Sequence, residues 1–422
     1  MDHYSSSPES RRPQGTESQQ TAQQRRAERL KYAKRQRNIR MGAIALAIVL
    51  SIVSLCVSCS TKKAVDDLAA KIEAKKAAQA ALAAQEAAPS DSPAPSQLPA
   101  NAKTVTLSFV GNLTLSSTDG SFEEAYGKYG ESYFFQNVRS IFEGDDLTIA
   151  NLEGTLTTSE NQADKDVTFK ADPSYVSILT QGGINCISVA GDHTLDYGNE
   201  GYVDTLAALD NAGIQRFGDS YTATVDVKGV KIGLSGINAC DTGLESQTLA
   251  VSNVKTLKDG GAQIVICAFH WGSDDATTPD DTQLQLAKAV IDAGADLVVG
   301  SHPHGLQGIS AYKGKYICYS LGDFCSGSIT ENQDTMIFQQ TFTLVNDAVQ
   351  SDADYTIIPC TVSPSTAASP YCPTPATGAE AQRILSAIYD QSAALDGGIA
   401  APDTENQDTQ ASALEANPSP SA

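Results

Sequence analysis

Between residues 103 and 365, short apolar runs alternate with stretches in which apolar residues recur at helical spacing. Strands are predicted at 104–110, 146–150, 185–190, 231–237, 262–270, 295–301 and 315–321. Helices are predicted between some of them, at 173–182, 199–212 and 280–293. Because nearly continuous apolar strands alternate with helices, we expect an α/β fold with strands buried on both faces. Two later segments alternate more strictly and are expected to add antiparallel strands, at 335–345 and 353–361.

One long run without any charged residue lies near the N-terminus, from Met41 to Thr61. A helix of about 20 residues crosses a bilayer core of about 30 Å, so the run predicts a transmembrane helix at 41–61. Basic residues are denser before the run than after it, and the positive-inside rule then places residues 1–40 in the cytoplasm. We therefore expect a single-pass cell-membrane protein with an extracytoplasmic main domain. Two alternatives stay open: cleavage as a signal peptide, and lipidation at Cys56 or Cys59.

Composition divides the rest of the chain into four parts. Residues 62–88 are rich in Ala, Lys, Glu and Gln and predict a helical stalk, whereas residues 89–102 form a Pro/Ser linker. The folded extracytoplasmic domain is expected at 103–365. Residues 366–422 form an acidic low-complexity tail with one short amphipathic helix, and disorder is expected from residue 397 onward.

The charge of the chain is unevenly distributed. The net charge is −21, but residues 1–40 carry ten Lys/Arg against four Asp/Glu, which leaves −27 for the other residues. Binding of duplex nucleic acid depends on clustered Lys and Arg. The acidic body therefore argues against nucleic acid as a partner.

Polar side chains follow six of the predicted strands. Ligands of α/β sheets gather beyond the carboxyl ends of the strands, so these side chains are candidates for a single site. They include four of the five histidines of the chain, and the fifth, His3, lies in the N-terminal segment. The candidates are Asn112, Asn151, Glu153, Asp192, His193, Asp196, His270, His302, His304 and Asp323.

The residue types in this set indicate metal chemistry. His302 and His304 flank a proline, which favours extended backbone before it, so both imidazoles are expected to project to one side. Imidazoles combined with carboxylates and amide oxygens suit Zn, Mn or Fe rather than a thiolate site. The alternative for any single histidine at a strand end is a hydrogen-bonded structural role, and Gly-Asn and Gly-Asp pairs also occur in ordinary turns.

Cysteine usage says less. Seven cysteines lie beyond the predicted membrane helix, and none of these seven forms a Cys-x-x-Cys motif. Several lie in apolar strands, where a free buried thiol is the usual state. In an oxidising exterior two disulfides stay open as alternatives, Cys360–Cys372 and Cys318–Cys325.

Six motifs follow one another in an order that resembles a known protein family. In chain order they are FVGNLTL, IANLEGTLT, ISVAGDHTLDYG, FHWGSD, GADLVVGSHPHGLQG and YSLGDF. They resemble the CapA family of capsule or poly-γ-glutamate biosynthesis proteins, also called PgsA, over about residues 103–345. That family belongs to the calcineurin-like metallophosphoesterase superfamily. The resemblance therefore implies a four-layer αββα sandwich with a metal site at the sheet ends, and a membrane helix before it in many members.

The resemblance also implies roles for individual residues. It assigns metal ligation to Asn112, Glu153, Asp192, His270, His302 and His304, with Asn151, Asp274 and Asp323 around them, and Asp196 is a further residue expected to line the site. His193 would act as a general acid beside Asp192. Asn112 stands where the family usually has Asp, whereas Asp192 and Asp323 stand where it usually has Asn. Either the negative charge has been relocated and a metal is still held, or the site has decayed and only the scaffold persists.

Three functions are compatible with these observations. The first, implied by the family, is a membrane-anchored component of surface-polymer synthesis or export, with membrane-bound synthase subunits as partners. The second is a metal-dependent hydrolase, in which the metal polarises a phosphoryl oxygen of a phosphoester or acts on another bond of a wall polymer. The third is a non-catalytic surface scaffold.

An anionic polymer such as polyglutamate would be repelled by the acidic body at long range. Capture would need a bridging cation or a local basic patch. The candidate lysines are scattered along the sequence, at Lys170, Lys228, Lys231, Lys313 and Lys315.

Overall fold

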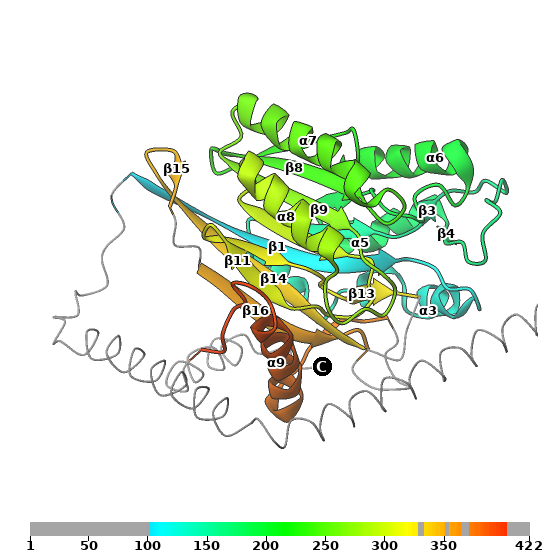
Figure 1. The fold of residues 1–422 in the computed structure, drawn as a ribbon. Helices are drawn as coiled ribbons and strands as arrows, with labels where there is room; N and C mark the ends of the chain where they lie inside the picture. Colours follow the sequence, from blue (N-terminus) through cyan, green and yellow to red (C-terminus); the bar gives the residue numbers. More distant parts are fainter. Residues whose placement is uncertain (1–98, 100, 328–332, 351–353, 364–370, 403–422) are drawn as a thin grey trace, which may run out of the picture. The chain divides into compact units, whose positions relative to one another are not determined.

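The computed structural model describes residues 99, 101–327, 333–350, 354–363 and 371–402 (Figure 1). The chain divides into two units, Met1–Ser96 and Gln97–Ala422, and all of the described residues belong to the second. The predicted N-terminal segment, membrane helix and stalk at 1–88 lie outside the described residues. Within the described part of the chain, no helix is both long enough and apolar enough to cross a bilayer.

Two large sheets form the framework of this unit. The first has the strand order β17-β16-β14-β1-β2-β5-β6, with β13 beside β1 and β15 beside β14. Its strands are β1 (Ala102–Thr114), β2 (Leu147–Leu152), β5 (Cys186–Ser188), β6 (Gln215–Phe217), β13 (Asp323–Ser326), β14 (Asp334–Val345), β15 (Ala348–Val349), β16 (Asp354–Thr361) and β17 (Thr374–Pro375). β1, β2, β5 and β6 are parallel, whereas β14 and β16 are antiparallel to their neighbours, as predicted for 335–345 and 353–361.

The second sheet has the order β11-β12-β10-β9-β8-β7. Its strands are β7 (Ala223–Val227), β8 (Val230–Asn238), β9 (Ile264–His270), β10 (Leu297–Ser301), β11 (Ile309–Tyr312) and β12 (Lys315–Cys318). The central strands β8, β9, β10 and β12 are parallel. A separate parallel pair is formed by β3 (Thr155–Leu156) and β4 (Lys170–Ala171).

Helices cover the outer faces of both sheets (Figure 1). On the first sheet lie α3 (Ser121–Tyr129), α4 (Arg139–Gly144), α5 (Val176–Gly182) and α6 (Gly198–Asn211), whose buried side chains share one core cluster with it. On the second sheet lie α7 (Gln247–Asp259) and α8 (Asp281–Ala293). The predicted helices at 173–182, 199–212 and 280–293 are confirmed, the first with a 3-10 turn at Pro173–Tyr175.

The strand β9 shows why the apolar runs are nearly continuous. Alternate side chains of a strand point to opposite faces of the sheet. Ile264, Ile266 and Ala268 belong to the core between the two sheets, whereas Val265 and Phe269 belong to the core beneath α7 and α8. Since both faces are buried, every position of β9 before His270 is apolar. The architecture is therefore an α/β sandwich, in which two sheets share an inner core and helices cover the outside.

The fold continues beyond the domain boundary expected at 365. The helix α9 (Gly378–Ala393) places Ile384 and Ile388, both fully buried, in the core between the sheets. After α9 the chain runs along β11, where Ile399 N–H donates to Ile309 O at 3.1 Å. Disorder from residue 397 is therefore wrong for residues 397–402. The segment is rich in Ala and Ser, which resembles tail composition, but its few large apolar residues lie on one helical face.

All seven cysteines in the described residues are free, so neither of the two open disulfides is formed. Cys318 belongs to the core between the sheets and Cys325 to the core beneath α3 to α6, so the first sheet separates them. Cys372 Sγ donates instead to Tyr133 O at 3.3 Å, and Cys360 Sγ to the carbonyl of Ile358 at 3.5 Å. Burial raises the pKa of the Cys360 thiol and keeps it protonated.

Candidate metal centre

The polar candidates meet at one end of the two sheets. His270 is the last residue of β9 and continues the face of Ile266 and Ala268, so its side chain enters the space between the sheets, where it is fully buried. Glu153 follows directly after β2 and is equally buried. Asp192 and His193 come after β5, and His302 and His304 come after β10. The carboxyl ends of parallel strands thus bring them together, as expected.

Three residues of the site are placed differently from what the sequence predicts. Asn112 lies within β1 rather than after it, since the strand continues to Thr114, and Asn151 likewise lies within β2. Asp323 does not follow a strand: β12 ends at Cys318, and Asp323 begins β13 in the other sheet, where it is the direct register partner of Asn112. The predicted strand 315–321 is therefore too long, because its last apolar residues are buried where the chain crosses between the sheets.

Gly111 allows β1 and β13 to approach each other closely. The carbonyl oxygen of Gly322 lies 1.7 Å from the point that a Cβ at Gly111 would occupy. The same oxygen accepts a hydrogen bond from Asn112 N–H at 3.2 Å. Any side chain at position 111 would push the two segments apart, so this position requires glycine. The result is that Asn112 and Asp323 lie side by side.

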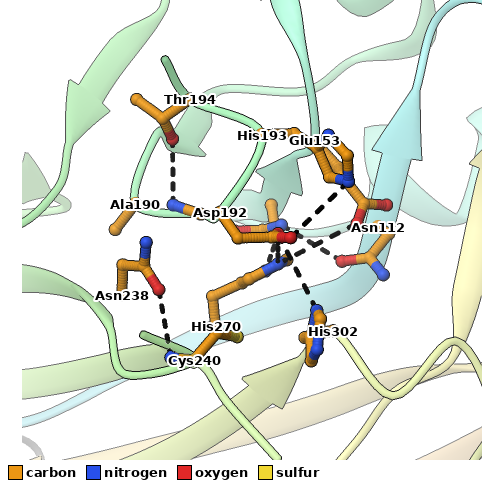
Figure 2. Close-up of polar contacts among 12 residues, drawn as sticks. Asn112, Glu153, Ala190, Asp192, His193, Thr194, Asn238, Cys240, His270 and His302 are labelled. Atoms are coloured by element: carbon orange, nitrogen blue, oxygen red, sulfur yellow. Dashed lines mark hydrogen bonds and ion pairs between the residues drawn. The ribbon is translucent and has the colours of Figure 1, made fainter. Parts of the chain in front are cut away.

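The first group of potential ligands consists of Glu153, Asp192, His270 and His302, whose ligand atoms lie within 4.8 Å of one another. Figure 2 shows the two imidazoles and the Asp192 carboxylate directed toward one another. His270 Nε2 lies 2.9 Å from Asp192 Oδ1 and 3.9 Å from Glu153 Oε1. His302 Nδ1 lies 3.8 Å from the same Asp192 oxygen.

A second group consists of Glu153, His304 and Asp323. His304 Nδ1 lies 3.0 Å from Asp323 Oδ1, and its Nε2 lies 3.9 Å from Glu153 Oε1. Asp274, which is mostly exposed, reaches in from the surface, with its Oδ1 3.3 Å from His302 Nε2. Glu153 belongs to both main groups and therefore connects them.

Cys240 was missed as a candidate ligand. It forms a third possible set with His270 and His302, and Figure 2 places it beside them. It lies two residues beyond the end of β8, a parallel strand next to β9. The rule that ligands gather at the carboxyl ends of parallel strands could have found it. Burial, together with nearby carboxylates, raises the pKa of Cys240 and favours its thiol form.

A chain of hydrogen bonds connects the two groups. Asn112 Nδ2 donates to Asp323 Oδ1 at 3.1 Å, and Asn151 Nδ2 donates to Asn112 Oδ1 at 3.1 Å. The same Asn151 nitrogen lies 3.1 Å from His270 Nδ1. Because an amide nitrogen only donates, His270 Nδ1 accepts, and the neutral ring carries its proton on Nε2, facing Asp192.

His193 stands next to the groups with a partner of its own. His193 Nδ1 lies 2.6 Å from Oδ2 of Asp196, and its Nε2 lies 3.5 Å from an Asp192 oxygen. The Asp196 carboxylate is fully buried and also accepts from Lys165 Nζ at 2.8 Å and from Phe169 N–H at 2.7 Å. Burial would lower the pKa of His193, but the hydrogen bond to Asp196 and the nearby carboxylates raise it.

Comparison with known proteins identifies the family. The family model described as bacterial capsule synthesis protein PGA_cap matches residues 106–328. The chain belongs to this family. A capsule biosynthesis protein CapA of Bacillus anthracis is 28% identical over 247 residues, covering 52% of this chain and 59% of that protein. A PGA biosynthesis protein CapA of Bacillus subtilis is 30% identical over 242 residues, covering 52% of this chain and 63% of that protein. The match thus spans about three fifths of these PGA_cap relatives.

Two further similarities are more distant. A probable polyglutamine synthesis accessory protein of Mycobacterium tuberculosis is 31% identical over 210 residues, covering 42% of this chain and 55% of its own. A solved structure of a hypothetical protein from Thermus thermophilus covers 60% of this chain and 99% of its own, with 14% identity and a TM-score of 0.38. That score is too low to support a conclusion about this PGA_cap protein.

PGA_cap is a metallophosphoesterase-like family, and the residues present here fit a divalent metal. Three buried atoms at the site have no hydrogen-bond partner among the described residues: Glu153 Oε1, His302 Nδ1 and Asp323 Oδ2. A buried polar atom without a partner costs free energy. All three are oxygen or nitrogen ligands of the kind that Zn, Mn and Fe accept. The donor set therefore matches the group that the family implies.

The backbone around His302 is strained. His302 has a φ of 95° and His304 a φ of 61°, values that residues other than glycine rarely adopt. The extended conformation expected before Pro303 is therefore wrong. The carbonyl of Pro303 accepts hydrogen bonds from Gly305 N–H at 2.7 Å and Asp275 N–H at 3.1 Å, which hold a tight turn instead. Both imidazoles still reach one site, and strain of this kind concentrates at functional sites.

Protonation differs between the two imidazoles of this turn. Burial and a neighbouring imidazole charge lower the pKa of His302 to about 4. Burial acts in the same direction on His304, but its hydrogen bond with Asp323 and the charge of Glu153 raise its pKa to about 10. Burial raises the pKa of Glu153. For Asp192, burial is outweighed by the His270 hydrogen bond and the surrounding imidazoles, which lower its pKa.

Proposed function

We propose that this protein is a membrane-anchored, extracytoplasmic component of capsule or poly-γ-glutamate biosynthesis, and that its strand-end site holds Mn, Zn or Fe. One observation carries the proposal: the region that matches the PGA_cap family, residues 106–328, contains every residue of the candidate metal centre. The names of the Bacillus relatives, capsule biosynthesis protein and PGA biosynthesis protein, support the same role.

Membrane attachment is proposed from the uncharged run at 41–61. The denser basic charge before this run supports a cytoplasmic N-terminus. A single helix of this kind would hold the main domain close to membrane-bound polymer synthase subunits, which we propose as partners.

The charges on the described surface affect whether the protein can bind an anionic polymer. Five lysines considered as a basic patch all have acidic or carbonyl partners. The pairs are Lys170 with Glu160, Lys228 with Asp146, Lys231 with the Gly260 carbonyl, Lys313 with Asp292 and Lys315 with Asp296. These lysines are therefore poor receptors for a polyanion. A cation at the metal centre would supply the positive charge that an acidic body needs.

Deletion of the gene in its native bacterium is expected to reduce the surface polymer strongly. Polymer released from washed cells, measured as glutamate after acid hydrolysis or as total capsule material, provides the readout. Complementation with the wild-type gene should restore the polymer, whereas the His302→Ala gene should not. Unchanged polymer in the deletion strain would show that the proposed role is wrong.

A second candidate function, a metal-dependent hydrolase acting on a phosphoester or a cell-surface polymer, is favoured by the His193–Asp196 pair. A bound divalent metal would supply Lewis-acid polarisation of a phosphoryl oxygen. Asp196 fixes the orientation of His193 through Nδ1, because its own carboxylate is held by Lys165 and by a backbone N–H. The free Nε2 then faces the site beside Asp192, where it could donate a proton to a leaving group. A non-catalytic scaffold would need no such pair.

His193→Ala is expected to lower hydrolysis of an alkyl phosphoester by about 10²–10⁴-fold, the usual contribution of a general acid. The loss should be much smaller for a p-nitrophenyl ester, whose leaving group needs no proton. Asp196→Asn should also lower hydrolysis of the alkyl ester more than that of the p-nitrophenyl ester, but by a smaller factor. His3→Ala serves as the matched control. Equal losses on both esters would assign His193 another role, and an inactive metal-loaded wild type would favour the scaffold.

A further inference from the structure

Asp323 is an unusual carboxylate. It is 2% exposed, and its Oδ1 is engaged both by Asn112 Nδ2 and by His304 Nδ1. Its Oδ2 is buried and has no hydrogen-bond partner among the described residues. Burying a carboxylate with one oxygen uncompensated is expensive. The unpaired oxygen therefore indicates a ligand at this position.

Glu153 carries a second unpaired oxygen in the group that it forms with His304 and Asp323. Its Oε2 accepts a hydrogen bond from Thr114 Oγ1 at 3.0 Å, which fixes the side chain. Its Oε1 is buried without a hydrogen-bond partner in the described chain and lies 3.9 Å from His304 Nε2. Two fully buried carboxylates that each keep one oxygen free beside one imidazole form a ligand set with enough negative charge for a divalent cation.

Asn112, in contrast, has no side-chain oxygen that lacks a hydrogen-bond partner. Its single side-chain oxygen accepts from Asn151, and its nitrogen donates to Asp323. Reversing the amide would place its oxygen against the Asp323 carboxylate. The charge of Asp323 thus fixes the orientation of Asn112, and Asn112 in turn holds Asp323 in place.

We propose that Asp323, rather than Asn112, is the carboxylate ligand of a second cation position formed with Glu153 and His304. This position lies next to the one formed by Asp192, His270 and His302, and Glu153 is shared by the two. Asn112 acts as a positioning residue for Asp323. The inference rests on the metal-binding part of the proposed function.

The test exchanges the amide and the carboxylate across their hydrogen bond. The full-length chain is purified in detergent, stripped of metal and titrated with Mn²⁺ alone. Calorimetry gives the number of ions bound, and electron paramagnetic resonance shows whether two bound ions are spin-coupled. The wild type is expected to bind two equivalents with a spin-coupled signal. Asp323→Asn should bind one equivalent without coupling, and the double variant Asn112→Asp/Asp323→Asn should bind two again.

The variants change one atom in each side chain, so packing is preserved, and thermal melting checks that each chain is folded. Asp145→Asn serves as the matched control, because Asp145 is a half-buried carboxylate held by Ser108 and Gln339 away from the centre. Two coupled equivalents in Asp323→Asn, or one equivalent in the double variant, would overturn the assignment of Asp323. Fewer than two equivalents in the wild type would also overturn it. Complete absence of binding would remove the metal from the proposed function as well, while the polymer phenotype is measured separately.

Discussion

Replacing His270 with alanine is expected to weaken divalent-metal binding by at least about 100-fold, the upper end of the loss caused by removing an outer-shell partner. His270 is fully buried, and its Nε2 lies 2.9 Å from Asp192 Oδ1 and 3.9 Å from Glu153 Oε1. In the His270→Ala variant the imidazole is missing from the centre of the group. The carboxylates of Asp192 and Glu153 then face each other without the His270 ring. Remaining ligands would hold a cation only weakly.

Mn²⁺ and Zn²⁺ titrations of wild type and His270→Ala provide the measurement, and the control is His3→Ala, which removes a histidine that is not among the candidate ligands. Wild-type affinity in His270→Ala would show that the imidazole is not a ligand.

The position of His270 could be predicted because it depends on local rules. The alternation along β9 fixes which face the residue joins, and the parallel arrangement fixes at which edge it emerges. The same reasoning correctly brought Glu153, Asp192 and the two histidines around Pro303 to one place. Their chemical roles remain predictions, because geometry alone does not identify a ligand.

Other features depend on contacts between distant parts of the chain, which no local pattern contains. Asn112 and Asp323 meet only because β13 pairs with β1 across more than two hundred residues. Relocation of the negative charge, one of the two alternatives that the sequence leaves open, has a geometric basis there, since the amide donates a hydrogen bond to the carboxylate. The helix α7 was not predicted because the face that it buries carries only two large apolar residues, Val254 and Leu257, next to Ala250 and Asn253.

The domain boundary expected at residue 365 is wrong for a related reason. The Ala- and Ser-rich composition of the following segment reflects the exposed face of α9, whereas the face that α9 buries is mostly apolar. A chain ending at residue 365 is therefore expected not to fold. It would lose Ile384, Ile388 and Ile399 from the core between the sheets. Each buried isoleucine contributes about 1.5–3 kcal/mol, and their sum is comparable with the whole stability of a domain, roughly 5–15 kcal/mol. The truncation would also leave the backbone of β11 without its partner segment.

Chains ending at residues 365 and 402 separate this effect from a general effect of shortening. The chain ending at 402 should melt cooperatively like the full-length protein, whereas the one ending at 365 should show no cooperative transition in circular dichroism. Within the full-length chain, Ile384→Ala should lower the free energy of unfolding by about 2–5 kcal/mol. Ser386→Ala, at an exposed position of the same helix, should change it by no more than about 0.5 kcal/mol. A cooperative transition in the chain ending at 365 would mean that the two sheets close their inner core without α9.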